Sequence, residues 1–188
     1  MKKLITLMFV LMAYSTVSFA QTKNEAEFHF KTFIGLMNFK SMGKSLDYYV
    51  DYASKAGLSK IYEEKDGREL YYVWADGVTY KKGHMTETYK KDGDAPKCLN
   101  VDLIESGNGV YSPMTITLIF PDKKAQQNFR QEGLNMGCVN EKKIYATDVD
   151  PTWKNVSCIK YVKHRLNTSW RYIFFYEKDG MNMCTFLF

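Results

Sequence analysis

Hydrophobic and polar residues alternate with a period of two over much of this chain. Leu99 and Leu103 fall on one side of such a segment, and Asn100 and Asp102 fall on the other. Segment 114–120 repeats the pattern, with threonines opposite its apolar positions. This alternation predicts antiparallel strands that each place one face on a core. Further strands are expected at about 27–37, 69–75, 78–83, 156–164, 170–178 and 181–188.

Turn dipeptides separate these strands. Asp-Gly pairs occur at 66–67, 76–77, 92–93 and 179–180. A Ser-Gly-Asn-Gly turn at 106–109 separates the two alternating segments described above. Such sequences favour tight hairpins, so successive strands are expected to pair as meanders.

Two segments have the helical period instead. In the first, Ser41 is the expected N-cap, the apolar face runs from Met42 to Ala53, and Gly57 supplies the left-handed residue that ends the helix. The second begins after Pro121, with Asp122 as the expected N-cap.

The second helix has a narrower apolar stripe, formed by Ala125, Phe129 and Met136, and Gly137 is expected to end it. Gly133 lies in its last turn. A glycine there weakens a helix by up to about 1 kcal/mol relative to alanine.

These elements predict an α+β fold, in which an antiparallel sheet of meanders packs against two helices. Strand, helix and meander occur in that order twice, which favours a duplicated unit with half-repeats at about 26–111 and 112–188. The helices repeat after about 80 residues, but the similar runs that begin at Cys98 and Cys158 repeat after about 60. Chance similarity is the alternative. In element order alone, the chain resembles secreted β-lactamase-inhibitor proteins; this resemblance assigns no role to any residue.

The beginning of the chain has the pattern of a secretory signal peptide. Two lysines precede an apolar run at 4–12, and Ser18 and Ala20 place small residues before Gln21. We expect residues 1–20 to be removed and residues 21–188 to form a single domain. The protein is then exported, to the periplasm or outside the cell, and this type of signal suggests a bacterial source.

Charge and hydropathy argue against a nucleic-acid partner and against a transmembrane segment. The formal net charge of +5 falls to +3 when Lys2 and Lys3 are removed. Lysine pairs are scattered among acids, whereas a surface for nucleic acid would concentrate them. No second apolar run approaches the roughly 20 residues that span a bilayer. We therefore expect no nucleic-acid partner and no transmembrane segment in the mature chain.

The four cysteines are Cys98, Cys138, Cys158 and Cys184. They form no C-x-x-C pair and have no histidine at a zinc-ligand spacing, so a redox or metal site is not expected. Export favours disulfides, and four cysteines allow three pairings; a pairing of Cys138 with Cys158, which would leave Cys98 with Cys184, is one of them. Buried free thiols are the alternative.

Neither a catalytic motif nor a cofactor motif is present. The chain has three histidines and lacks a G-x-S-x-G turn, an H-E-x-x-H helix and a glycine-rich phosphate loop. We expect no cofactor and favour a non-enzymatic binding or protein-interaction module. The alternatives are a hydrolase of envelope or external polymers and a structural component of the envelope.

The segment 170–176 is the candidate binding surface, because both of its faces are apolar. Trp170 and Tyr172 share one face, and Arg171 and Phe175 share the other. A central strand covered on both sides is one interpretation. The other is an open aromatic face that binds a protein or a glycan, since tyrosine and tryptophan combine an apolar ring with a polar tip.

Overall fold

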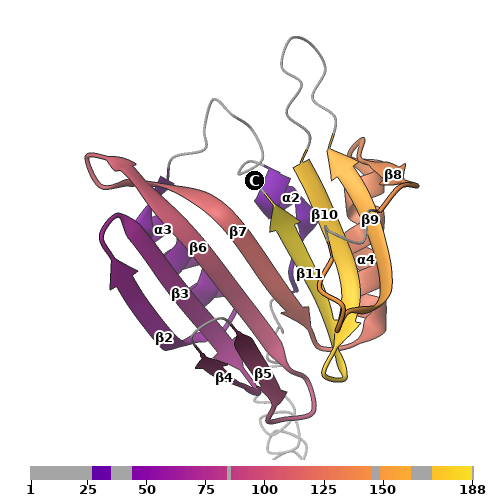
Figure 1. Ribbon diagram of the computed structural model, residues 1–188, viewed down its shortest axis with the longest axis horizontal. Coiled ribbons are helices and arrows are strands. Elements are labelled where there is room, and N and C mark those ends of the chain that lie inside the picture. The colour runs from indigo at the N-terminus through magenta and orange to yellow at the C-terminus, as the bar shows by residue number, and fades with distance from the viewer. Residues whose placement is uncertain (1–26, 35–43, 84–85, 145–148, 162–170, 188) are drawn as a thin grey trace, which may run out of the picture.

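The computed structural model of the protein describes residues 27–34, 44–83, 86–144, 149–161 and 171–187 (Figure 1). The expected signal peptide at residues 1–20, the expected cap Ser41 and the candidate site residue Trp170 lie outside these ranges. Within them, no helix is long and apolar enough to cross a membrane.

Most of the described chain is β-strand, as the alternation predicts. The strands are β1 (Lys44–Ser45), β2 (Ser59–Asp66), β3 (Glu69–Asp76), β4 (Val78–Lys82), β5 (Glu87–Lys91), β6 (Lys97–Gly107), β7 (Val110–Phe120), β8 (Val139–Glu141), β9 (Lys154–Tyr161), β10 (Arg171–Lys178) and β11 (Met181–Leu187). The helices are α2 (Phe30–Ile34), α3 (Leu46–Lys55) and α4 (Lys123–Asn135). An antiparallel sheet packed against helices is therefore confirmed, with one more short helix than expected.

Nine strands form one antiparallel sheet in the order β2-β3-β6-β7-β11-β10-β9-β8, with β1 added beside β7. Strands β4 and β5 form a separate hairpin. Helix α3 precedes the meander β2-β3-β6-β7, and α4 precedes the meander β8-β9-β10-β11. The last strands of the two meanders, β7 and β11, pair at the centre of the sheet. Cys98 lies on the third strand of its meander and Cys158 on the second, so the similar runs around them are not equivalent in topology.

The strand expected at 27–37 is wrong, because residues 30–34 form the helix α2. Phe30 and Phe33 are both buried, and their spacing of three places them on one helical face. The Phe30 N–H donates to the Glu132 carboxylate of α4 over 2.7 Å. This bond satisfies a helix-end donor from a distant element, which local sequence does not reveal.

Helix α3 begins later than expected, with Ser45 rather than Ser41 as its N-cap residue. Strand β1 pairs with β7 up to Ser45, which keeps the backbone extended until that point. The expected end is confirmed: Gly57 has a φ of 72°, and the Leu58 N–H donates to the Ala53 carbonyl over 2.9 Å.

Helix α4 begins as predicted, because the Asp122 carboxylate accepts a hydrogen bond from the Ala125 N–H at 2.7 Å. Gly133 has a packing role that its helix propensity does not suggest. A Cβ at this position would lie 2.7 Å from Cε2 of Phe30 and 2.8 Å from Cδ1 of Ile159. The glycine therefore allows α4 to approach both α2 and the sheet.

The sheet face that packs on the helices is apolar. Its buried residues are Leu70, Tyr72, Trp74, Leu99, Val101, Leu103, Ile116, Leu118, Phe120, Ile159, Ile173, Phe175, Cys184 and Phe186. Phe129 of α4 is fully buried against them, with ring centroids 5.2 Å from both Phe30 and Phe120. Burial of this size is the main source of stability for such a fold.

The opposite face of the sheet, which we call the front face, is covered at its two sides by different elements. The hairpin β4-β5 buries Val78 and Tyr89 against β3 and β6. Across the sheet, Trp153 stacks on Tyr176 of β10, with centroids 3.8 Å apart and planes 5° from parallel. Figure 1 shows the helices behind the sheet and the central strands β7 and β11 between its two halves.

Candidate functional site

Cross-strand register collects polar residues at the centre of the front face. Read from β10 to β3, the two central rows are Tyr172-Leu187-Thr115-Asp102-Tyr71 and Phe174-Thr185-Thr117-Asn100-Val73. Directly opposed residues of antiparallel strands have Cβ atoms about 4.5–5.5 Å apart. The hydroxyl, amide and carboxylate groups of β6, β7 and β11 therefore form one continuous patch.

Asn100 lies buried within a cluster of tyrosines. Its Nδ2 donates to the hydroxyls of Tyr71 and Tyr89 and lies 3.2 Å from Oε2 of Glu87. Tyr80 donates to the Tyr71 hydroxyl over 3.0 Å, and Tyr89 donates to Glu87 over 2.9 Å. Burial raises the pKa of the Tyr71 and Tyr89 hydroxyls well above the usual value, so both stay protonated. This network fixes the hairpin onto one half of the sheet.

A second network lies on the other half. The hydroxyls of Thr117 and Thr185 are 2.9 Å apart, and the Tyr176 hydroxyl lies 2.8 Å from that of Thr185. Trp153 covers the ring of Tyr176. Both flanks of the patch are thus rigid, because their polar groups are satisfied by one another.

Asp102 differs from its neighbours, because it makes no hydrogen bond or ion pair with any residue that the structure describes. Its side chain is half-buried between Tyr71 and Thr115. Burial, together with the charges of Glu69 and Glu87, raises the pKa of its carboxyl group to about 6, although Lys82 opposes this shift. At neutral pH the front face therefore carries a partly desolvated negative charge that no described residue pairs with.

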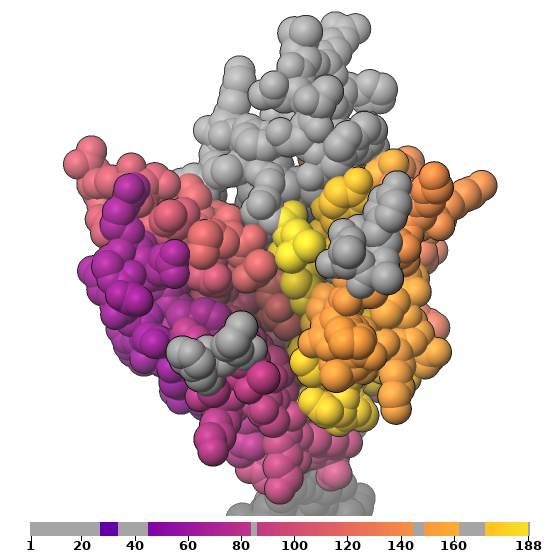
Figure 2. All heavy atoms as spheres, in the orientation of Figure 1, coloured from indigo at the N-terminus to yellow at the C-terminus, as the bar shows by residue number. Residues whose placement is uncertain are grey.

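The patch lies in a depression of the molecular surface. Figure 2 shows the front face hollowed between its two halves, with β7 at the bottom of the depression. We call the residues Asp102, Thr115, Thr117, Leu187 and Tyr172 the hollow. The first three are half-buried on its floor, whereas Leu187 and Tyr172 are each 36% exposed. The hollow is therefore open to a ligand at its centre and along the Tyr172 side.

The structure places two of the four candidate binding residues of segment 170–176 on opposite faces of β10. Tyr172 is exposed and belongs to the hollow. Phe175 is 2% exposed and packs on the helix side, with its ring 6.5 Å from that of Phe129. Helix α4 therefore covers the side of the strand on which Phe175 lies, as the interpretation of a covered strand expects for this residue. Trp170 and the side chain of Arg171 lie outside the described residues.

The four cysteines are buried free thiols, so the expected disulfides are wrong for this fold. Cys98 and Cys184 face opposite sides of the sheet, with β7 between their strands. Cys138 and Cys158 also face opposite sides, and β8 places Glu141, three residues after Cys138, opposite Cys158. A disulfide requires Cα atoms within about 7 Å. Burial raises the pKa of the thiols of Cys138 and Cys158 to about 11, which keeps them protonated and unreactive.

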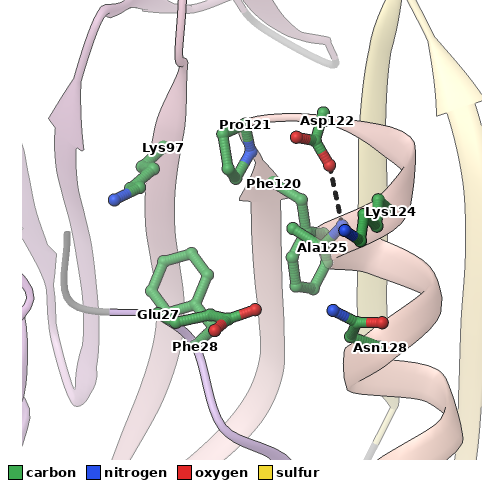
Figure 3. Close-up of a pocket in the computed structure, with 9 residues that line it drawn as sticks. All are labelled: Glu27, Phe28, Lys97, Phe120, Pro121, Asp122, Lys124, Ala125 and Asn128. Carbon is green, nitrogen blue, oxygen red and sulfur yellow. Dashed lines mark hydrogen bonds between the residues drawn. The ribbon is translucent and has the colours of Figure 1, made fainter.

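A cavity of about 340 Å³ lies beside the N-terminus of α4 (Figure 3). Its lining includes two acids, Glu27 and Asp122, and two lysines, Lys97 and Lys124. Asp122 already caps the helix through the Ala125 N–H. Mixed charge and an occupied carboxylate select no class of ligand, so this cavity is a weaker candidate than the hollow.

Sequence reasoning placed Asp102 and the threonines opposite the core face of their strands and named Tyr172 as a candidate binding residue, but it did not predict that they converge. The signal that they converge is present in the chain. Counting outward from the pair Gly107 and Val110 at the hairpin turn places Asp102 opposite Thr115 and Asn100 opposite Thr117. The observed register agrees at these positions because two register shifts nearer the turn cancel. The contribution of β11 could not be found in this way, because its pairing with β7 is long-range.

Comparison with protein-family models, with curated proteins and with solved structures finds no match for this chain. The function is therefore inferred from the geometry of its own residues.

Proposed function

We propose that this protein is an exported, non-enzymatic binding module that holds its partner in the hollow of the front face. The observation that carries the proposal is the half-buried carboxylate of Asp102, which has no partner among the described residues. Such a group destabilises a folded protein until a ligand satisfies it. Groups with perturbed pKa values in concave surfaces are therefore candidates for binding or catalysis.

The chemistry of the surrounding side chains supports a binding role. Tyrosine, threonine and asparagine line the hollow and its walls, and similar compositions serve as adaptable contact surfaces in binding proteins. The two hydrogen-bond networks hold the walls in place, so little ordering would be needed on binding. Tyr172 and Leu187 offer exposed apolar surface at the rim.

We also propose that the two halves derive from a duplicated unit and that the hollow lies at their junction. The ends of the two helices support this idea. Gly57 and Gly137 both have positive φ, and β2 and β8 each begin two residues later. The last strands of the two meanders then meet at the floor of the hollow.

A search for ligands with a blocked variant tests the binding role. The purified protein is panned against a phage library of short disulfide-closed peptide loops. Thr115→Arg places a long cationic side chain beside Asp102, and Val50→Arg adds the same residue to the exposed surface of α3 as the control. Loops that bind in the hollow should no longer bind the Thr115→Arg variant but should still bind the Val50→Arg variant. Recovery of no loops, or of loops insensitive to Thr115→Arg, would contradict the proposal.

Export requires its own measurement. When the full chain is produced in a Gram-negative bacterium, the proposed signal peptide should be removed before Gln21. Intact-mass analysis of the periplasmic fraction and the medium should find a chain that begins at this residue, open or cyclised. Protein that retains Met1 and stays in the cytoplasm would refute export without affecting the binding proposal.

A hydrolase remains the second candidate, for one specific reason. A carboxyl group with a pKa of about 6, raised by burial and by neighbouring acids, has the properties of a general acid. Release of reducing sugar from bacterial envelope polymers, abolished by Asp102→Asn, would favour this function over simple binding.

A further inference from the structure

The distribution of charge around the hollow indicates what kind of group it accepts. Glu69 and Glu87 act on Asp102 with the same sign of charge, and Lys82 is the cation that opposes them. The Lys82 ammonium is already paired with the Glu64 carboxylate, and it lies 4.5 Å from the centroid of the Tyr71 ring. The acids around Asp102 therefore leave an excess of negative charge at this end of the hollow.

Among the side chains that the structure describes, none at the opposite end of the hollow adds a compensating charge. Lys160 stands next to Tyr172 in the register, but its ammonium lies 2.6 Å from the Glu141 carboxylate. The floor between the two ends consists of threonine hydroxyls and an aliphatic side chain. A neutral ligand could bond to the hydroxyls, but only a cation would also compensate the charge on Asp102.

The dimensions of the hollow favour a loop of a protein over a small ion. Neighbouring strands lie about 4.8 Å apart. From Asp102 to Tyr172 the row crosses three such intervals, a width of roughly 14 Å. That width suits a hairpin or loop lying across the strands, with one side chain directed at the floor.

We propose that the hollow binds a loop of a partner protein and that a lysine or arginine of this loop pairs with the Asp102 carboxylate. This inference rests on the proposed binding function and specifies the chemistry of its partner. Asp102 thus receives from the partner the counter-ion that the described part of its own chain does not supply.

Synthetic loops test the inference directly. Loops recovered from the phage library are made with the basic residue retained, or replaced by citrulline for arginine and norleucine for lysine. Affinities are measured by calorimetry for the unaltered protein, for Asp102→Asn, and for Asp47→Asn. Asp47 is an exposed acid on α3, so its loss changes the net charge equally at a distant site.

Neutral replacement in the loop and Asp102→Asn should each weaken binding by at least about tenfold, and the combination should weaken it little further, as expected for two partners of one pair. Asp47→Asn should leave binding unchanged. Lowering the pH below about 6 should reproduce the effect of Asp102→Asn, because protonation removes the same charge.

Other occupants of the hollow give different results. Loops that bind the hollow without a basic residue would overturn the inference while leaving the binding function intact. Loops that bind the Asp102→Asn variant as tightly as the unaltered protein would do the same. Trimers of β-linked glucose or N-acetylglucosamine are tested in the same way. If they bind the unaltered protein but not the Thr115→Arg variant, the ligand of the hollow is a glycan and not a protein loop. A dimer seen by sedimentation, and broken by Thr115→Arg but not by Val50→Arg, would place a second copy of this chain in the hollow.

Discussion

The two faces of strands β6 and β7 are made from alternate residues of the same segments, yet they differ in chemistry. On the helix side, Val101 and Ile116 are fully buried in the apolar core. On the front side, Asp102 follows Val101 in the sequence and Thr115 precedes Ile116, and both are half-buried and polar. One face therefore stabilises the fold, and the other is available for function.

The comparison also shows how the sheet can tolerate an unpaired acid. Complete burial of a valine or isoleucine side chain contributes roughly 1.5–3 kcal/mol, and the helix side supplies many such residues. This apolar face can offset one unfavourable group on the front side. Proteins commonly give up some stability in this way where a site requires it.

The largest expected effect comes from the helix side. Phe129→Ala removes a fully buried ring that contacts aromatic rings of α2, β7 and β11. We expect a loss of about 3–5 kcal/mol in the free energy of unfolding, measured by urea denaturation. Met136, the outer member of the predicted stripe, is 37% exposed. Met136→Ala is therefore the control, with an expected loss below about 1 kcal/mol, and equal losses would show that the core does not centre on Phe129.

Gly133→Ala tests the close approach of α4 to the sheet. Alanine favours a helix by up to about 1 kcal/mol over glycine, but its Cβ would overlap Phe30 and Ile159. Overpacking in a core destabilises by about 1–3 kcal/mol, so we expect a net loss of about 1–2 kcal/mol in chemical denaturation. Asn128→Ala on the exposed side of the same helix should be neutral or slightly stabilising. A more stable Gly133→Ala protein would show that the two side chains can move aside.

Asp102→Asn should stabilise the protein instead, and the size of this gain depends on pH. The unfolded carboxyl has a pKa of about 3.9, and the folded one about 6. Between these values the folded chain retains a proton that the unfolded chain has lost, so stability falls as pH rises and the full penalty applies above about pH 6.

Removing this charge should raise the free energy of unfolding at pH 7 on the order of 1 kcal/mol, allowing for screening at a half-exposed site. The gain should disappear near pH 4, where Asp102 is neutral in both states. Asp47→Asn should show no such pH-dependent gain. Thermal melts across this pH range measure the difference, and a destabilised Asp102→Asn protein would mean that the carboxylate has a structural partner.

Local sequence predicted those features that depend on neighbouring residues. The alternation at 99–103 and the cap at Asp122 depend on short-range geometry, and both were found. Helix α2 was missed because Glu132, a hundred positions away, helps to fix its first turn. The hollow was missed for a related reason: its acid and threonines pair within one hairpin, but Leu187 and Tyr172 join them only through the long-range pairing of β11 with β7.

The smallest expected effect concerns the cysteines, and it tests whether the two faces are chemically separate. Cys98 and Cys158 lie on the front side, and Cys138 and Cys184 lie on the helix side. Each expected disulfide would therefore have to connect opposite faces of one sheet.

A reductant should leave the melting temperature unchanged, whereas losing a disulfide typically costs about 2–4 kcal/mol. Ellman titration should find four thiols after unfolding and none reactive in the folded protein, because burial raises their pKa values. A reductant-sensitive melt with fewer than four thiols would mean that a cross-link joins the faces and that the sheet is rearranged around it.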